Sequence, residues 1–246
     1  MNHSPQSAPA MDRLPAWLAS CHQDLILPRR KAIQNHRFVQ SMLQGQSEKV
    51  DAEWFFSGLM WHLLDFGKHV GHLMAKRPVE VSDFLKGRSE DEDGDTGILK
   101  RIVDALGGSS DQIIKQPWTY RPHPVWITHD ALLRSAVYST DLSWQAGAAA
   151  LNVGIESLVP TMIEPLFHAA TKNYGLSKNQ SEWLESRSGE AEKQHGENGY
   201  LILAEFVPQN DVELQQKCRF MIDALSYSMA YRLLESGLPR SASRVF

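Results

Sequence analysis

The chain has 246 residues but only two cysteines, Cys21 and Cys218, which lie near its opposite ends. They form neither a C-x-x-C pair nor a zinc-binding spacing, which argues against a disulfide-stapled fold and a zinc finger. We expect both to be reduced thiols in the core, as is typical of a cytoplasmic protein.

Positive charge is not in excess, because 25 lysines and arginines face 29 aspartates and glutamates. The formal net charge of -4 leaves no basic footprint for nucleic acid. No run of about eighteen apolar residues is present, and the N-terminal stretch MNHSPQSAPAMDRLP has no apolar centre. We therefore expect no nucleic-acid partner, no membrane span and no signal peptide.

Several catalytic signatures are missing as well. The sequence has no G-x-S-x-G motif, no glycine-rich phosphate loop and no G-x-G-x-x-G after a strand. Neither cysteine has a histidine in a recognisable catalytic frame. The acidic segment SEDEDGD, residues 89–95, lacks the ligand order and closing glutamate of a calcium loop, so we expect no calcium site.

Helical periodicity, by contrast, runs along almost the whole chain, and no alternating strand pattern interrupts it. Prolines and glycines mark the predicted helix ends, while Pro160 and Pro165 should bend one helix. The predicted helices cover 14–27, 29–45, 47–77, 79–106 with an interruption at the acidic segment, 129–141, 143–174, 179–206 and 210–236.

The chain shows neither an internal repeat nor a long linker. We therefore predict one all-α domain over residues 14–237, a single-domain bundle of seven or eight helices. Residues 1–13 are expected to form a flexible arm, because they are rich in serine, proline and asparagine, and residues 238–246 a polar tail.

Helical phase indicates which polar side chains face the core, because neighbours on one face lie three, four and seven positions apart. Glu156 shares its face with Ala149, Val153, Val159 and Ile163, which are all apolar. We therefore expect Glu156 to be buried, where a carboxylate needs a cation, hydrogen-bond donors or a proton.

The nearby pair Glu164 and His168 has the i, i+4 spacing of metal ligands but a different phase. Its face-mates Ser157, Thr161 and Thr171 are polar. We therefore expect this pair to be solvated rather than to form a site.

The segment EAEKQHGENGY, residues 190–200, places an acid and an imidazole three residues apart, Glu192 and His195. His195 lies eleven residues after Leu184 and seven before Ile202, on the apolar stripe of its predicted helix. Together with the inward Glu156 on a separate helix, this pair indicates a site. The alternative is a core histidine that a local acid satisfies.

A third group of polar residues follows one helical stripe in WHLLDFGKHVGHL. It consists of His62, Asp65, His69 and His72, and neighbouring members could chelate a metal ion. A separate apolar stripe already gives this helix a core face. The alternative is therefore a solvated or interface stripe.

Five longer segments together resemble one superfamily: NHRFVQSMLQGQSEKVDAEWFFSGLMWHLLDF, EDEDGDTGILKRIVDALGG, GIESLVPTMIEPLFHAATKNYGL, EAEKQHGENGYLIL and FMIDALSYSMAYRLLESGL. In this order they are similar to helices of the heme-oxygenase-like superfamily. The branch is the one that holds the TenA thiaminases, the pyrroloquinoline-quinone synthase PqqC and the heme-oxygenase-like diiron oxidases. The resemblance covers nearly the whole chain after residue 30. It implies a heme-oxygenase-like fold and a homodimer.

For the diiron oxidases the resemblance implies six metal ligands, the last three in the pattern H-x3-D-x2-H. Glu156 matches the central glutamate, Glu192 stands where aspartate is usual, and His195 matches the last histidine. Ser188 stands where the first histidine of the pattern is expected, and a serine is not a normal iron ligand.

The two ligands expected near the acidic segment depart from the pattern too. The acid could be Glu90 or Glu92, while the expected histidine falls close to Asp95. An altered, carboxylate-richer iron site could then recruit further donors, namely Asp95, Asp223, His69 and His72.

We therefore expect an oxidase or oxygenase that acts on a small molecule with dioxygen. Its non-heme iron, up to two ions per chain in the family's pattern, would be held by Glu156, Glu192 and His195. If the site is metal-free, as in PqqC, polar side chains would position the substrate, and His195 would be the best general base. A non-catalytic binding protein is the third alternative. The sequence does not identify the substrate.

Overall fold

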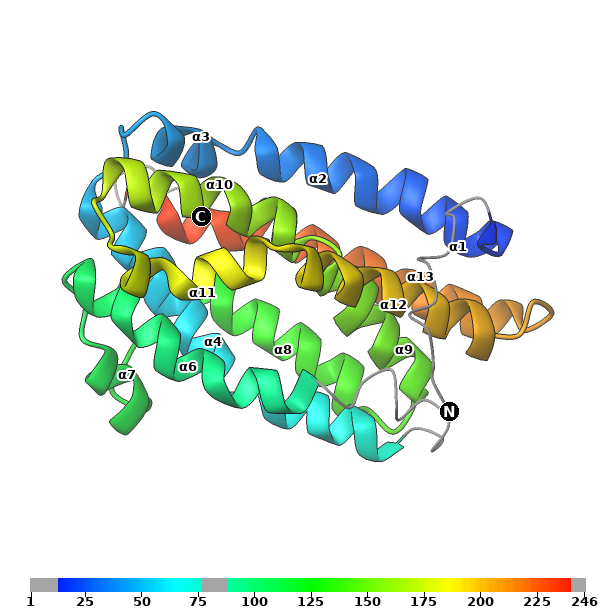
Figure 1. The fold of residues 1–246 in the computed structure, drawn as a ribbon. Helices are drawn as coiled ribbons and strands as arrows, with labels where there is room; N and C mark the ends of the chain where they lie inside the picture. Colours follow the sequence, from blue (N-terminus) through cyan, green and yellow to red (C-terminus); the bar gives the residue numbers. More distant parts are fainter. Residues whose placement is uncertain (1–12, 77–87, 240–246) are drawn as a thin grey trace, which may run out of the picture.

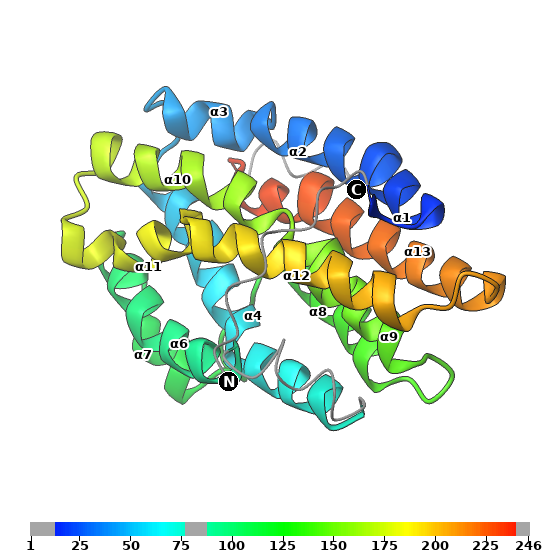
Figure 2. The same ribbon diagram turned by 45° about the vertical axis from the view of Figure 1, so that its right-hand side comes forward.

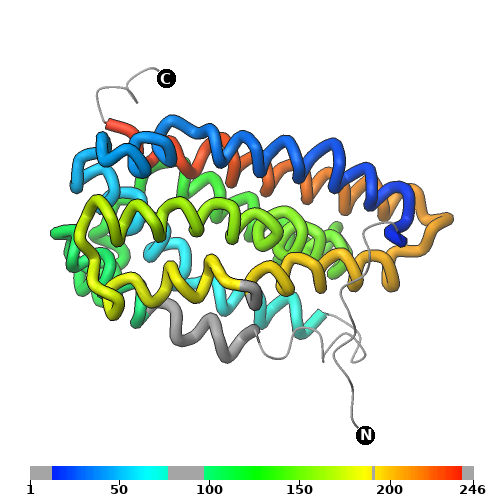
Figure 3. Tube along the Cα trace, turned by 45° about the horizontal axis from the view of Figure 1, so that its top comes forward, coloured from blue at the N-terminus to red at the C-terminus, as the bar shows by residue number. Residues whose placement is uncertain are grey.

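The computed structural model describes residues 13–76 and 88–239, without the side chains of residues 88–96, 190 and 191. Within these ranges every regular element is a helix, as predicted, and the helices pack side by side into one elongated bundle (Figure 1). The first helices run beside the last ones, so both ends of the described chain contribute to one core (Figure 3).

Most of the described elements are α-helices, and four are helices of other types. The segments η2, η4 and η5 have the wider π-helical turn, and η6 is a 3-10 helix. In chain order the elements are α1 (Ala16–Cys21), η2 (His22–Ile26), α2 (Leu27–Gln34), α3 (Arg37–Leu43), α4 (Lys49–Lys76), α6 (Arg88–Ala105), α7 (Ser110–Lys115), α8 (Pro124–Tyr138), α9 (Trp144–Ala148), η4 (Ala149–Glu156), α10 (Val159–Asn173), α11 (Lys178–Ser188), α12 (Glu190–Phe206), α13 (Val212–Tyr227), η5 (Ser228–Arg232) and η6 (Leu233–Gly237).

Two elements organise the core. α4 lies between α6 and α8 (Figure 2), and η4 packs against both α12 and α13. The stretch Trp144–Asn173, which contains η4, is long and apolar enough to cross a membrane, but 89 % of its most apolar window is buried inside the bundle. Such burial is typical of the core helix of a soluble protein.

The structure corrects the predicted ends of the first helices. Pro28 does not end a helix, because it is the second residue of α2, and a proline is tolerated in the first turn of a helix. The helix is interrupted instead just before α3. There Nδ1 of His36 accepts a hydrogen bond from the N–H of Phe38 at 3.2 Å. Histidine is not among the preferred capping residues, so the sequence gives little sign of this break.

α6 brings a second correction. The predicted interruption at the acidic segment is wrong, because the helix runs unbroken through both Gly94 and Gly97. The predicted end is confirmed: Gly107 has a φ of 95°, and its N–H donates to the carbonyl of Asp104 at 3.0 Å. The predicted start of this helix lies outside the described residues.

Two of the long predicted helices, 143–174 and 179–206, each contain a break. A two-residue turn after Glu156 separates η4 from α10, so that Pro160 becomes the second residue of α10, where a proline is tolerated. Gly189, in extended conformation, separates α11 from α12. Both breaks lie close to predicted site residues, because Glu192 follows Gly189 by one helical turn.

Close packing between α4 and α8 requires a glycine at position 58. A Cβ atom there would overlap the indole ring of Trp126. This ring is fully buried, and its Nε1–H donates to Oγ of Ser236 at 3.0 Å. Gly71, exposed on the same helix, has no atom within 4 Å of the equivalent Cβ position.

We predict that Gly58→Ala lowers the free energy of unfolding by about 1–3 kcal/mol, because the added methyl group must displace a packed ring. The same change at Gly71 should raise it by about 0.5–1 kcal/mol, since alanine is the better helix former and the space is open. Chemical denaturation followed by circular dichroism measures both effects. Equal effects at the two positions would show that α4 and α8 do not pack as described.

Candidate functional site

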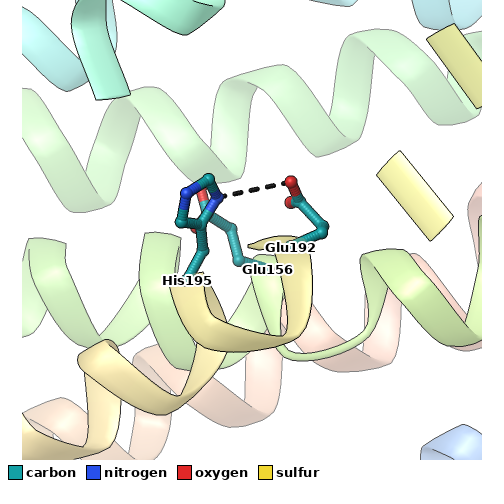
Figure 4. Close-up of side chains that lie close together, drawn as sticks. All are labelled: Glu156, Glu192 and His195. Atoms are coloured by element: carbon teal, nitrogen blue, oxygen red, sulfur yellow. Dashed lines mark ion pairs between the residues drawn. The ribbon is translucent and has the colours of Figure 1, made fainter. Parts of the chain in front are cut away.

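Glu156 is the last residue of η4 and lies inside the bundle with 2 % of its surface exposed. This is the predicted burial, although helical phase did not decide it, because every residue of η4 is buried. A π-helical turn re-aims side chains relative to an α-helix, and such turns are frequent at functional sites. Figure 4 shows the Glu156 carboxylate beside the imidazole of His195.

α12 supplies two further polar side chains to the same region. Glu192 is buried, and His195 is half-buried with 19 % of its side chain exposed. Nδ1 of His195 lies 3.3 Å from Oε2 of Glu192, one helical turn away (Figure 4). Glu192 is therefore the deeper member of the pair, and His195 lies closer to solvent.

These three side chains form a compact cluster. One possible ligand atom each from Glu156, Glu192 and His195 lies within 4.8 Å of the other two. Among the described histidines, cysteines and acids, this is the one group of three or more with such proximity. Two carboxylates and an imidazole are donors that suit Fe²⁺ and similar divalent ions.

Two glycines of α12 allow the cluster to form. A Cβ atom at Gly196 would lie 2.8 Å from Cα of Ser157, and one at Gly199 would lie 2.5 Å from Cβ of Asn152. The backbone of α12 therefore touches the middle of η4 at Gly199 and the residue that follows η4 at Gly196. This close approach brings His195 next to Glu156.

Arg187 is a fourth charged residue of the site, and sequence reasoning missed it. It lies near the end of α11, is buried, and donates from Nη1 to Oε2 of Glu192 at 2.9 Å. Burial alone would raise the pKa of Glu192, but the hydrogen bond from His195 and the charge of Arg187 outweigh it, so that the pKa is lowered. Glu192 is therefore ionised at neutral pH.

A cavity of about 60 Å³ lies beside the cluster, and Glu156, Glu192 and Arg187 form one of its walls. Much of the remaining lining is apolar, from side chains such as Leu59, Phe66, Trp126, Met162 and Trp183. Such a lining limits the entry of water and strengthens electrostatic interactions inside.

The cavity has a second polar part, formed by His62 and His129. Their ring centroids lie 5.1 Å apart in an edge-to-face arrangement. Nδ1 of His129 lies 2.9 Å from Oγ of Ser228, whereas its buried Nε2 finds no hydrogen-bond partner among the described residues. Burial first, and the charge of His62 second, place the pKa of His129 well below its ordinary value, so this ring is neutral.

Asp130 lies behind His62 and contacts two imidazole rings and one guanidinium group. Its Oδ1 is 3.4 Å from Nδ1 of His62 and 3.3 Å from Nε2 of His69, and its Oδ2 accepts from Nε of Arg134 at 2.5 Å. Burial would raise the pKa of Asp130, but these partners hold it far below the usual range. Asp130 is therefore an ionised carboxylate in the interior.

This network corrects the interpretation of the stripe on α4. His62 and His69 are buried rather than solvated, whereas Asp65 is half-buried and pairs with Lys68 and Arg134. Nδ1 of His69 lies 3.0 Å from the hydroxyl of Tyr138, and the ring of His72 stacks on the same tyrosine at 4.3 Å.

The further donors proposed for an altered iron site therefore lie elsewhere where their side chains are described. His69 and His72 belong to the Asp130 and Tyr138 contacts, and Asp223 forms an ion pair with Arg29. None of these three joins the Glu156 cluster. The side chains of Glu90, Glu92 and Asp95 lie outside the described residues.

Two further predictions about single residues can be compared with the structure. Ser188 directs its hydroxyl to the carbonyl of Glu185 at 2.9 Å, within its own helix. Glu164 and His168 are exposed on α10, as their phase predicted. Arg187 and His129 could not be found in this way, because their partners lie across a helix break or on another helix.

Comparison with solved structures places this geometry in a known fold. A TenA homologue from Pseudomonas syringae pv. tomato superposes with a TM-score of 0.81 at 16 % identity, covering 94 % of this chain and 96 % of that one. A domain of unknown function with a heme oxygenase-like fold from Shewanella denitrificans gives 0.71 at 15 % identity, covering 89 % and 91 %. A TenA family transcription regulator from Silicibacter sp. gives 0.61 at 12 % identity, covering 94 % and 100 %.

No protein-family model matches the chain, and no curated protein matches it in sequence. The structural likeness spans nearly the whole of both chains, whereas the identities are low enough that it bears on fold alone. The resemblance read from the sequence is thereby confirmed at the level of architecture: the chain has the all-α, heme-oxygenase-like fold that TenA homologues share.

Proposed function

We propose that this protein is an oxidase or oxygenase that acts on a small molecule with dioxygen, using one non-heme iron ion held by Glu156, Glu192 and His195. The observation that carries the proposal is the convergence of these side chains within 4.8 Å beside an apolar cavity. The superfamily that the sequence resembles holds oxidases of this kind.

The donor set fits a divalent ion. Two carboxylates balance the charge of Fe²⁺, and an imidazole adds the nitrogen ligand common in non-heme iron sites. Three protein ligands leave room for other groups on one ion. Since Arg187 already contacts Glu192 and Ser188 is bonded within its helix, the described side chains favour one ion over the two of the family's pattern.

Iron, when bound, supplies the one-electron chemistry that dioxygen requires. The contribution of the protein is position and exclusion. η4 and α12 hold three donors in place, and apolar walls limit the access of water to reactive species. Arg187 compensates the charge of Glu192, which would otherwise be costly in this interior.

One observation favours a second candidate, a metal-free oxidase. Arg187 already gives Glu192 a positive partner, so the site is partly neutralised without metal. In that case His195 would act as general base toward the substrate. Anaerobic titration with Fe²⁺ separates the two: one ion per chain and an oxygen-sensitive absorption band support the iron site. Oxygen uptake with substrate but without iron supports the second candidate, and neither signal leaves a binding protein.

Removing a donor tests the cluster directly. We predict that Glu156→Ala weakens iron binding by more than about 100-fold, since even the partners of metal ligands are worth 10–100-fold in affinity. Helical content, measured by circular dichroism, should persist. Calorimetric titration with Fe²⁺ under argon measures the affinity.

The matched control is Glu164→Ala, the same change at an exposed glutamate eight residues further along the chain. It should leave iron affinity within about twofold, because a solvated carboxylate contributes little to a site it does not face. Similar losses in both variants would show that the assignment of inward and outward carboxylates is wrong.

Replacing Arg187 is expected to change protein stability and iron affinity in opposite directions. We predict that Arg187→Gln destabilises the metal-free protein by about 3 kcal/mol, because it leaves Glu192 buried without its cation. The same variant should bind Fe²⁺ at least about tenfold more tightly, since a positive charge next to the ion is gone. Thermal denaturation and metal titration measure the two effects.

Arg101→Gln is the control for this variant. Arg101 pairs with Glu182 at 2.6 Å on the surface, and both side chains are largely exposed, so little change is expected in either measurement. Weaker iron binding in Arg187→Gln would contradict the proposed site, because it would mean that Arg187 supports the ion rather than competing with it.

A further inference from the structure

His62 lies between the inner cavity and the surface of the protein. Among the lining residues of the described cavities, it is the side chain that borders both the inner cavity beside Glu156 and an outer cleft of about 280 Å³. This cleft lies over α4, the end of α7 and α8, and Asp65, Asp130 and Arg134 also line it. His62 itself is only 4 % exposed.

The partner of His62 fixes the state of its ring. Nδ1 of His62 faces Oδ1 of Asp130 at 3.4 Å without forming a direct hydrogen bond, and since an ionised carboxylate can only accept, this contact favours the tautomer with the hydrogen on Nδ1. The lone pair of the neutral ring is then on Nε2. Asp130 itself lines the outer cleft, so a proton can pass from it to water without crossing another side chain.

The other imidazole of the cavity lacks this arrangement. His129 is fully buried, and its Nδ1 contacts a serine hydroxyl rather than a carboxylate. Asp130 acts on His129 only at longer range, because no carboxylate among the described residues is in hydrogen-bond contact with this ring, and the ring does not border the outer cleft. Of the two imidazoles, His62 is therefore the one that can take up a proton in this dry region.

We propose that His62 transfers protons between the inner cavity and water, a role that rests on the cavity being the reaction site proposed above. A ligand in the cavity gives a proton to Nε2 of the neutral ring, which becomes an imidazolium beside ionised Asp130. The Nδ1 proton then leaves by way of Asp130 to water in the outer cleft. In total one proton moves from the cavity to water, and no electron is transferred. The reverse sequence carries a proton from water to the cavity and restores the tautomer with the hydrogen on Nδ1.

Several charged or titratable groups face His62 and set the field around it. Asp130 and Arg134 lie on the side of the outer cleft, and His129 lies beside the ring. Across the cavity are Glu156, Glu192 and Arg187, and on its own helix are Asp65, Lys68 and His69. Asp130 is the acid among them with a direct contact to the ring, so its charge should dominate.

The first experiment uses the metal-free protein, so that it does not depend on iron. NMR of protein with ¹³C-labelled histidine follows each ring as pH is lowered, and His62→Gln identifies the signal. We expect His62 to become protonated in the folded protein while His129 stays neutral. Asp130→Asn keeps the shape of the side chain but removes its charge. In this variant, protonation of His62 should require an about tenfold higher proton concentration.

Two outcomes of this titration would overturn the proposal. One is a His62 ring that stays neutral throughout the folded range. The other is a His62 titration that Asp130→Asn leaves unchanged. Asp130→Glu, which keeps the charge, should restore most of the wild-type behaviour, and a merely structural role of Asp130 would not produce this difference between the two variants.

The second experiment uses iron-loaded protein and oxygen consumption. Glutamine fills much of the volume of histidine but does not exchange protons, so His62→Gln should lower the rate by about 100-fold. Iron affinity should stay within about twofold. The control is His72→Gln, the same change on the same helix at a residue outside the cavity, and it should alter neither quantity.

An unchanged rate in His62→Gln would overturn the proton-transfer role. A large loss of iron affinity would do so as well, because it would make His62 a ligand. Failure of the wild-type protein to bind iron would instead remove the proposed function, and the NMR titration would still decide whether His62 and Asp130 form a proton-carrying pair.

Discussion

The site depends on the contact between two helix backbones. α12 can pack against η4 and Ser157 this closely only because Gly196 and Gly199 present no side chain there. Any larger residue would push the helices apart and separate His195 from Glu156. The segment from Glu192 to Gly199 therefore has two roles, because one face offers donors to the interior and the adjacent face offers bare backbone to η4.

The interior contains more charged side chains than the stability of the fold alone would favour. Glu156, Glu192, Arg187 and Asp130 are all buried, and replacing such groups by apolar residues of similar size is often neutral or stabilising. Two of these buried acids are paired with arginines, Glu192 with Arg187 and Asp130 with Arg134. Their arrangement around one cavity favours a chemical role over a stabilising one.

Sequence periodicity predicted the all-helical bundle and the inward direction of Glu156 and His195, although every residue of η4 is buried and phase therefore did not decide the burial of Glu156. Periodicity did not predict the interruptions between helices. Each of them depends on a weak local signal, such as the histidine cap of α3 or the extended Gly189. The break at Gly189 is also the reason why sequence reasoning missed Arg187. A helical face cannot be followed across an extended residue, so the contact of Arg187 with Glu192 has no periodic signature.

The error on α4 has a different cause. An amphipathic helix is expected to bury one stripe, and the separate apolar stripe left the histidines to solvent. α4, however, is enclosed between α6 and α8, and residues 55–60 are buried on every side. A helix in the middle of a bundle has two inner faces, and its second face can hold polar side chains when another helix brings their partners. α8 does this with Asp130, which lies 68 positions after His62, a distance in sequence at which no spacing rule applies.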